Sequence, residues 1–328
     1  PRIPARLVPS LALAALAALA GPAVAQDTPL RVLATVGMLG DVAANVAGDC
    51  ATVETLIGAG TDPHDYSATP SAVEAIAAAE LILYVDRTLE ERLADVLDRF
   101  SARTPTLGVV GATFAPADLL EDPDAAGSID PHLWMDVSRW ARIAPVIADA
   151  IAEQRPDCAD AMAQTVADYA AQLEALHAWV GTAIASIPED RRQLVTAHDA
   201  FEYFADAYGM TASEAIEGIS TASEASIGDI RDVAAFVVDS GVPAVFVETT
   251  VNPRTIEALV AEVRNQGHEV AIGGALFSDA MGDDGTPEGT YIGMIRANTA
   301  TITAALGGTL PDWPEALADW AQAWDITP

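Results

Sequence analysis

Four residues able to bind a metal ion lie in similar surroundings along the chain. His64 lies in T-D-P-H-D-Y, His132 in D-P-H-L-W-M-D and His198 in A-H-D-A-F, and Asp279 follows the apolar run G-G-A-L-F-S. Imidazole is a good ligand for zinc, copper, iron or nickel, and carboxylate oxygen also suits manganese. Because this turn-rich arrangement recurs, we interpret the four residues as ligands of one divalent metal ion.

The expected elements place these side chains near strand ends. The strand-like run Thr52–Ile57 precedes His64, and Gln193–Ala197 leads directly to His198. In a chain of alternating strands and helices, a side chain just past the carboxyl end of a strand points into the crevice where such folds bind ligands. Two of the four ligands fall in each half of the chain, so we expect the metal between two lobes.

The order of the patterns predicts an α/β fold. Strand-like and helical stretches alternate in both halves, which implies parallel sheets. Between them, residues 157–186 form one helical pattern, which at 1.5 Å per residue spans roughly 45 Å. We therefore expect two β/α lobes with parallel sheets, joined by a long rigid backbone helix, with the metal in the inter-lobe cleft. The expected divisions are a signal peptide at 1–25, an N-terminal lobe at 26–154, the linking helix at 155–187 and a C-terminal lobe at 188–328.

Apolar runs and helical periodicity give the expected element boundaries. Strands are predicted at Leu30–Val36, Ala51–Ile57, Leu81–Val85, Thr106–Val110, Gln193–Ala197, Met210–Glu214, Ala244–Glu248 and Glu269–Ile272. Besides the linking helix, helical patterns are found at Leu39–Ala47, Ser71–Ala79, Leu89–Phe100, Val137–Gln154, Ala200–Ala207, Ile227–Ser240, Pro253–Asn265, Tyr291–Ala305 and Pro314–Ala323.

The remaining histidines and one glutamate are assigned other roles. His177 lies inside the expected linking helix and His268 precedes a strand, so both are interpreted as surface or packing residues. Glu248 ends the run V-F-V-E, and we expect it to pair with an arginine such as Arg254 rather than to bind metal. The aromatic residues near the ligands, namely Trp134, Phe201, Tyr203 and Phe204, are expected to pack around the ligand loops.

Composition narrows the classes of partner. The chain has 48 acidic residues against 16 basic ones, for a formal charge of −32. Nucleic acid is therefore not an expected partner, because no basic patch is available to neutralise phosphates. All 16 basic residues are arginine, which we interpret as proteome-wide bias rather than as a specific acidic function. The two cysteines, Cys50 and Cys158, lack metal-site spacing, and the sequence alone leaves open whether they form a disulfide.

The first residues have the features of an export signal. Arg2 and Arg6 precede the apolar stretch 7–20, and Ala23-Val24-Ala25 is an A-x-A cleavage motif. We expect the mature chain to begin at Gln26 and to be periplasmic. No cysteine follows the apolar stretch, so we expect no lipid-attachment site.

Five stretches of the sequence together resemble those of a known family. D-P-H-D-Y, D-P-H-L-W-M-D and H-D-A-F-E-Y-F-A-D-A-Y-G, together with E-G-I-S-T-A-S-E-A-S and the run from Gly267 to Gly293, are similar to the cluster A-I metal-binding receptors of ABC transporters, in their TroA-like zinc/manganese branch. The similarity runs from about Leu30 to Gly307. It implies two lobes joined by a backbone helix, with the four family ligand positions matching His64, His132, His198 and Asp279.

Two departures bear on the metal. Dedicated zinc receptors of this kind carry a histidine-rich acidic loop before the second ligand, whereas residues 112–130 are acidic without histidine. Typical manganese receptors have glutamate at the third ligand position, where this chain has His198. The resemblance therefore leaves zinc and manganese open.

The leading hypothesis is a binding protein and not an enzyme. It captures one divalent ion, Zn²⁺ or Mn²⁺, and delivers it as a monomer to an inner-membrane ABC permease with its ATPase. A secreted zinc-dependent hydrolase and a metal-binding adhesin are the alternatives. The hydrolase is disfavoured because all four positions are filled by side chains and no H-E-x-x-H pattern occurs.

Overall fold

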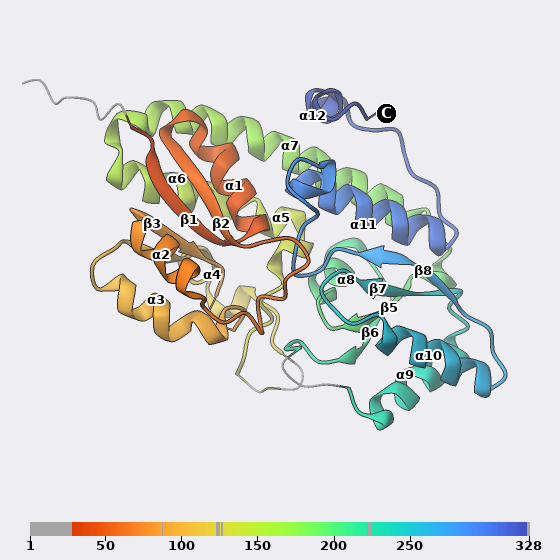
Figure 1. Cartoon of the computed structure of the whole chain (residues 1–328). Helices are drawn as coiled ribbons and strands as arrows, with labels where there is room; N and C mark the ends of the chain where they lie inside the picture. Colours follow the sequence, from red (N-terminus) through yellow and green to blue (C-terminus); the bar gives the residue numbers. More distant parts are fainter. Residues whose placement is uncertain (1–27, 87, 123–124, 126, 222–224, 327–328) are drawn as a thin grey trace, which may run out of the picture.

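The chain folds into two lobes connected by one long helix (Figure 1). The computed structural model describes residues 28–86, 88–122, 125, 127–221 and 225–326. The linking helix α7, Ala159–Ala185, contacts α1 and α6 of the first lobe and α8 and α11 of the second. The predicted α/β fold with two lobes and a backbone helix is thus confirmed.

The first lobe is built on a four-stranded parallel sheet. Its strands have the order β2-β1-β3-β4 and are β1 Leu30–Val36, β2 Ala51–Ile57, β3 Leu81–Tyr84 and β4 Thr106–Gly108. The central strand β1 is buried from Val32 to Val36. A parallel strand that is covered on both faces has a nearly continuous apolar sequence. For this reason the bounds of β1 could be predicted to the residue.

The second lobe repeats that order. Two parallel pairs, β5-β6 and β7-β8, place β5 beside β7, so the strands follow one another as β6-β5-β7-β8. Their bounds are β5 Gln193–His198, β6 Ala212–Glu217, β7 Ala244–Glu248 and β8 Ala271–Leu276. The carboxyl ends of these parallel strands meet at one edge, where Asp279 follows β8.

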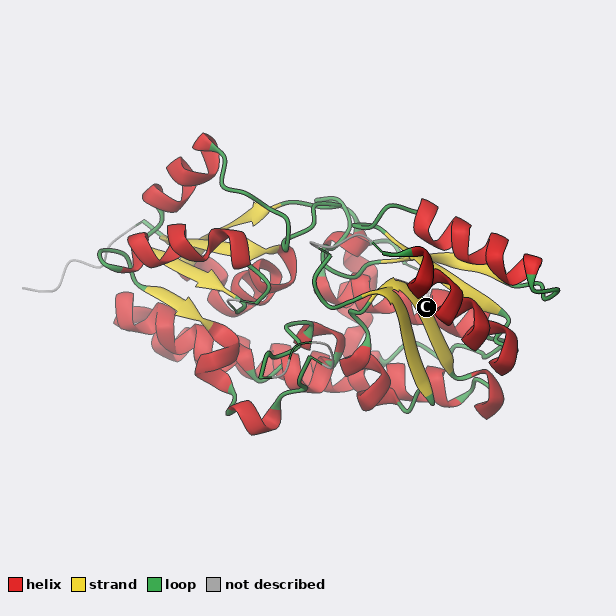
Figure 2. Ribbon diagram, turned by 90° about the horizontal axis from the view of Figure 1, so that it is seen from below, coloured by secondary structure: helices red, strands yellow, loops and turns green. Residues whose placement is uncertain are grey.

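Helices pack against the sheets of both lobes (Figure 2). Those of the first lobe are α1 Gly37–Ala47, α2 Pro70–Ala78, α3 Ala94–Ser101, α4 Val109–Thr113, α5 Val137–Trp140 and α6 Ile143–Gln154. After the linking helix come α8 Glu202–Tyr208, α9 Ile227–Ser240, α10 Arg254–Asn265, α11 Tyr291–Ala305 and α12 Ala318–Ala323. Ser226 and Asp229 form a capping box at the start of α9, which fixes that boundary where the sequence predicts it.

Several predicted elements differ from the structure. Val109 and Val110, expected to end a strand, begin helix α4, and strand β6 lies two to three residues later than expected. The helical stretch expected over Val137–Gln154 is divided into α5 and α6 by a break at residues 141–142. The linking helix begins at Ala159, because Pro156 opens a 3-10 turn that ends at Cys158. Strand β8 lies later than the expected Glu269–Ile272 and includes two glycines.

Those glycines permit close packing of α11 on β8. A Cβ added at Gly273 would lie 2.7 Å from the Ala305 side chain, and one at Gly274 would lie 2.6 Å from that of Thr301. Gly274 also has a φ of 146°, which side-chain-bearing residues rarely adopt. The glycine pair is therefore part of strand β8, although glycines in a sequence pattern usually suggest that a strand is interrupted.

A disulfide ties the first lobe to the start of the linking helix. Cys50, just before β2, and Cys158, just before α7, are bonded with their Cα atoms 6.1 Å apart. The sequence left this pairing open because the two residues are 108 positions apart.

Two further points concern export. The expected signal peptide at 1–25 and its cleavage before Gln26 lie outside the described residues. Among the helices that the structure describes, none combines the length and apolar character needed to cross a bilayer.

Candidate metal centre

His64 lies in the loop between β2 and α2, residues 58–69, which we call the His64 loop. Asp62 fixes its turn, since Oδ1 of Asp62 accepts a hydrogen bond from the His64 backbone N–H at 2.8 Å. Pro70 then begins α2, with the Thr69 hydroxyl accepting from the backbone N–H of Ala72. The His64 side chain is buried although its loop is partly exposed.

His132 is oriented by the carboxylate two residues before it. Oδ1 of Asp130 accepts from the His132 backbone N–H at 2.9 Å and lies 2.7 Å from ring Nδ1. With Nδ1–H donating to that carboxylate, Nε2 is left to face the other candidate ligands. Both side chains are almost completely buried.

His198 ends β5 and is oriented in the same way by Glu248, at the end of β7. Oε1 of Glu248 accepts from the backbone N–H groups of Ala197 and His198 at 2.9 and 2.8 Å, and Oε2 lies 2.6 Å from Nδ1 of His198. The expectation that Glu248 pairs with Arg254 is therefore wrong. Both strands end at the same edge of the lobe, so this glutamate reaches the neighbouring histidine before any arginine.

Asp279 completes the group. Its Oδ1 lies 3.2 Å from Nε2 of His132, and its Oδ2 lies 3.4 Å from Nε2 of His198 and 3.8 Å from Nε2 of His64. The Nε2 atoms of His64 and His198 lie 3.4 and 3.3 Å from that of His132. All four donor atoms lie within 4.8 Å of one another, and all four side chains are buried.

These distances suit a tetrahedral ion. Ligand atoms about 2.0–2.1 Å from a zinc ion at the centre of a tetrahedron are roughly 3.4 Å apart, close to the separations found here. Among the described residues, no group other than the three imidazoles is within hydrogen-bond reach of either Asp279 oxygen. A buried carboxylate is costly unless positive charge compensates it, and a divalent metal held by these four donors would supply that charge.

The pKa values divide the three histidines. Burial lowers the pKa of His64 to about 4. Burial acts on His132 too, but the adjacent Asp130 and then Asp279 raise its pKa to about 10. At His198, burial is outweighed by Asp279 and Glu248, and the pKa rises to about 9. Burial opposes ionisation of Asp279, but the imidazoles, first that of His198, bring its pKa below the usual value.

The segment carrying His132 is hydrogen-bonded to the second lobe. Nε1 of Trp134 donates to the Ser278 carbonyl at 2.8 Å, and the Tyr291 hydroxyl donates to the Trp134 carbonyl at 2.7 Å. The Tyr203 hydroxyl donates to the Asp130 carbonyl at 3.1 Å. The aromatic residues near the ligands are buried as expected, but Trp134 and Tyr203 also hold the His132 segment by these specific bonds.

The two remaining histidines lie outside the group. Nδ1 of His177, on α7, is 3.2 Å from the Tyr208 hydroxyl. His268 precedes β8 and donates its backbone N–H to the Val263 carbonyl. Asp130 and Glu248 are the functional residues that sequence reasoning missed. The repeated D-P-H motif was a signal for Asp130, whereas only the strand-end position of Glu248 hinted at its role.

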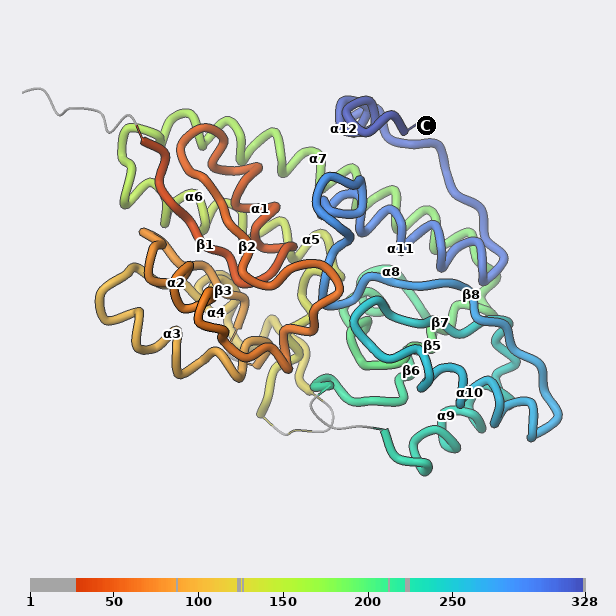
Figure 3. Tube along the Cα trace, in the orientation of Figure 1, coloured from red at the N-terminus to blue at the C-terminus, as the bar shows by residue number. Residues whose placement is uncertain are grey.

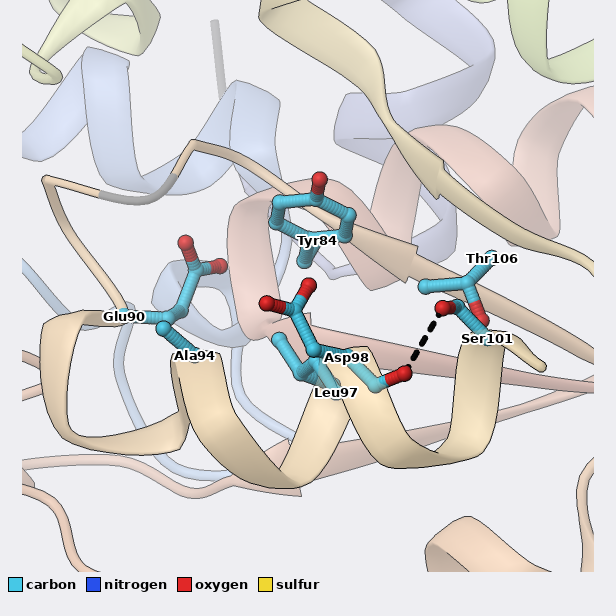
Figure 4. A pocket seen from close by; sticks show the side chains of 7 residues that line it. All are labelled: Tyr84, Glu90, Ala94, Leu97, Asp98, Ser101 and Thr106. Atoms are coloured by element: carbon cyan, nitrogen blue, oxygen red, sulfur yellow. Dashed lines mark hydrogen bonds between the residues drawn. The ribbon is translucent and has the colours of Figure 1, made fainter.

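A separate cavity of about 220 Å³ lies in the first lobe beside α3 (Figure 4). It is lined by Tyr84, Glu90 and Asp98, among others, and shares no residue with the four-residue group. Glu90 accepts from the Thr35 hydroxyl and from the backbone N–H groups of Val85 and Asp86. Burial raises the pKa of Glu90 to about 7. The Glu90 carboxylate therefore serves as a hydrogen-bond acceptor for the polypeptide backbone.

The two-lobed fold, with three imidazoles and one carboxylate converging between the lobes, defines a receptor of the metal-binding class. The chain belongs to the family described as zinc-uptake complex component A, periplasmic, whose model matches residues 32–305. The resemblance drawn from the motifs is thereby confirmed.

Named relatives bind different metals. The chain is 40% identical over 284 residues to the zinc-binding protein TroA of Treponema pallidum, covering 87% of this chain and 91% of that protein. It is 37% identical over 280 residues to the manganese-binding lipoprotein MntA of Bacillus subtilis, covering 85% and 90%. The solved structure of periplasmic zinc-binding TroA matches with a TM-score of 0.81 at 39% identity, over 85% of this chain and 99% of that one.

Proposed function

We propose that this protein captures one divalent metal ion, Zn²⁺ or Mn²⁺, through His64, His132, His198 and Asp279, and delivers it to a membrane permease. The observation that carries the proposal is the convergence of four buried donor atoms around one point, where the Asp279 carboxylate is contacted by the three imidazoles alone among the described residues. The ion is the transported cargo. Relatives named for zinc and for manganese agree with this donor set.

The donor set favours binding over catalysis. A catalytic zinc keeps an open coordination position for water. Here four side chains surround the point where the ion would lie, and the carboxylates nearest them, Asp130 and Glu248, are each engaged by a histidine. We therefore propose that the protein is not an enzyme, and we set the hydrolase hypothesis aside.

The proposed cellular setting follows from the sequence. Residues 1–25 direct export, the mature chain is periplasmic, and it works as a monomer with an ABC permease and its ATPase. We retain the proposed division into a lobe at 26–154, a linking helix at 155–187 and a lobe at 188–328. No nucleic acid takes part.

Metal titration tests the proposal. Wild-type protein freed of metal should bind one equivalent of Zn²⁺ or of Mn²⁺, and Zn²⁺ should displace Mn²⁺ at equal free concentrations, following the usual order of divalent affinities. His268→Ala is the matched control and should bind one equivalent with unchanged affinity. Two tight equivalents, or weaker binding by His268→Ala, would contradict the four-ligand site.

We expect the availability of each metal in the periplasm to decide which ion the protein carries. Elemental analysis of protein purified from its native periplasm identifies that ion, because overexpression loads whichever metal is abundant. Finding neither zinc nor manganese in that preparation would contradict the proposed cargo.

A further inference from the structure

Asp62 contacts both sides of the candidate site. Its Oδ1 accepts from the backbone N–H of His64, which fixes the turn that presents this ligand. Its Oδ2 accepts from the hydroxyl of Thr221, which belongs to the second lobe four residues beyond the end of β6. One carboxylate therefore joins the His64 turn to the opposite lobe.

His64 depends on its loop more than the other ligands depend on theirs. No carboxylate contacts Nδ1 of His64, and the one hydrogen-bonding neighbour of its side chain outside the ligand group among the described residues is the backbone of Thr88. By contrast, Asp130 and Glu248 orient the rings of His132 and His198. The His64 loop runs along the boundary between the lobes before it reaches α2 (Figure 3). The position of His64 relative to the other three ligands is thus set by its backbone turn.

The contact between Asp62 and Thr221 also lines a cavity. This cavity, of about 420 Å³, is bounded in addition by Glu217, Thr250 and Thr255 of the second lobe. If the Thr221 hydroxyl separated from the Asp62 carboxylate, the His64 turn would lose this contact with the opposite lobe. The separation would take place at the wall of this polar cavity.

We propose that the hydrogen bond from Thr221 to Asp62, here called the Asp62–Thr221 latch, holds His64 over the bound ion and sets how long the ion is retained. This inference rests on the proposed metal capture. Asp62 and Thr221 are positioning residues, since neither is among the four donors. Metal leaves when the latch opens and the His64 loop moves away, while the other three donors stay in place.

The latch should act on dissociation. A hydrogen bond to a charged group contributes enough that its loss speeds release on the order of 10–100-fold. Association changes far less, because the latch closes after the ion has reached the other donors. Differences among variants of one binding site generally appear in the dissociation rate.

Stopped-flow release of Zn²⁺ to an excess of chelator tests this in four proteins. Thr221→Val removes the hydroxyl at nearly constant shape, whereas Thr221→Ser keeps it. Thr255→Val is the matched control, because Thr255 is also half-buried, lines the same cavity and donates to Glu217 within the second lobe. We expect fast release from Thr221→Val alone, with Thr221→Ser and Thr255→Val close to wild type.

The outcomes separate the latch from the proposed function. Wild-type protein that binds no Zn²⁺ refutes the proposed function. Wild-type protein that binds Zn²⁺ and releases it as fast as Thr221→Val refutes the latch alone, as does fast release from Thr221→Ser or Thr255→Val.

A double-mutant cycle covers the case in which Thr221→Val does not fold. Asp62→Ala and Thr221→Ala are then combined, and the latch requires that their effects on the release rate be strongly non-additive. Additive effects overturn it.

Discussion

Two D-P-H motifs with the same three letters do different things in this molecule. At 130–132 the aspartate contacts both the backbone N–H and the ring of its histidine, whereas at 62–64 it contacts only the backbone N–H and turns its other oxygen to Thr221. We call His132 and His198 the braced histidines, since a buried carboxylate contacts Nδ1 of each. His64 is unbraced.

This difference gives the site a fixed side and a movable side. The braced histidines and Asp279 are held by the second lobe, with the His132 segment hydrogen-bonded to Ser278 and Tyr291. His64 is supplied by a loop of the first lobe. A receptor must bind its ion tightly and also release it. A site with one movable ligand meets both demands, because the other three ligands keep their positions when the ion leaves.

The largest effect is expected from removing the carboxylate of the fixed side. Asp279→Ala should weaken Mn²⁺ binding more than Zn²⁺ binding, because it deletes the only oxygen donor and leaves imidazoles that zinc accepts readily. The loss should exceed that caused by His64→Ala, which leaves the fixed side intact. Competition titrations measure the affinities of both variants for both ions. If Asp279→Ala loses equal affinity for Zn²⁺ and Mn²⁺, or if His64→Ala loses more affinity than Asp279→Ala, the distinction between a fixed and a movable side is wrong.

Proton release should also differ between the two sides. The raised pKa values of His132 and His198, to about 10 and about 9, mean that both braced histidines are protonated at neutral pH in the unloaded site. His64, with its pKa lowered to about 4, is already neutral. Metal binding should therefore displace about two protons, and affinity should rise on the order of 100-fold per pH unit from pH 6 towards 9.

A pH indicator in weakly buffered protein measures this release directly. His64→Ala is the control and should release the same number of protons as the wild type. Release of fewer than one proton, or a large drop in His64→Ala, would show that the braced histidines are not the protonated ones.

An intermediate effect is expected from the carboxylate that braces His198. In Glu248→Gln the amide can accept from Nδ1–H with its oxygen, but its NH₂ group then faces the backbone N–H groups of Ala197 and His198. Loss of such a partner typically weakens metal binding about 10–100-fold. Calorimetric titration with Zn²⁺ gives the ratio, and an unchanged affinity would mean that the brace does not tune the ligand.

Glu90→Gln is the matched control, because Glu90 is an equally buried glutamate in the other lobe. It should leave Zn²⁺ affinity unchanged and alter stability instead. The folded pKa of Glu90, raised to about 7, contributes stability that is present below about pH 4.5 and is lost as pH rises through 7. Urea unfolding should show a flatter pH dependence for Glu90→Gln across that window, and an unaltered slope would contradict the assignment.

The smallest effect on metal binding is expected from the disulfide, which lies away from both sides of the site. Replacing Cys50 and Cys158 together by serine opens a loop of 108 positions, and the chain-entropy model assigns such a bridge about 4–5 kcal/mol of stability. Denaturant unfolding should reveal that loss, while Zn²⁺ affinity stays within about twofold. A marked drop in affinity would show that the bridge helps to place the ligands.

The sequence predicted what local pattern controls and missed what distant residues decide. Buried apolar runs gave β1 and β7 to the residue, and the turn residues around His64 and His132 marked the site. The brace from Glu248 to His198 joins positions 50 residues apart, and Thr221 meets Asp62 across 159. Such pairs follow from the strand order and the packing of the lobes, which no local pattern specifies. The break between α5 and α6 did have a local signal, since Pro145 has no N–H to donate to the Ala141 carbonyl, and the sequence prediction overlooked it.

Anomalous diffraction from crystals loaded with Zn²⁺, and separately with Mn²⁺, tests the central claim most directly. The account predicts one strong peak per molecule, surrounded by Nε2 of His64, His132 and His198 and by the carboxylate of Asp279, with Asp130 and Glu248 still contacting Nδ1 of their histidines. A peak at any other place, a second peak of equal strength, or a bound ion that leaves His64 or Asp279 uncoordinated would contradict it.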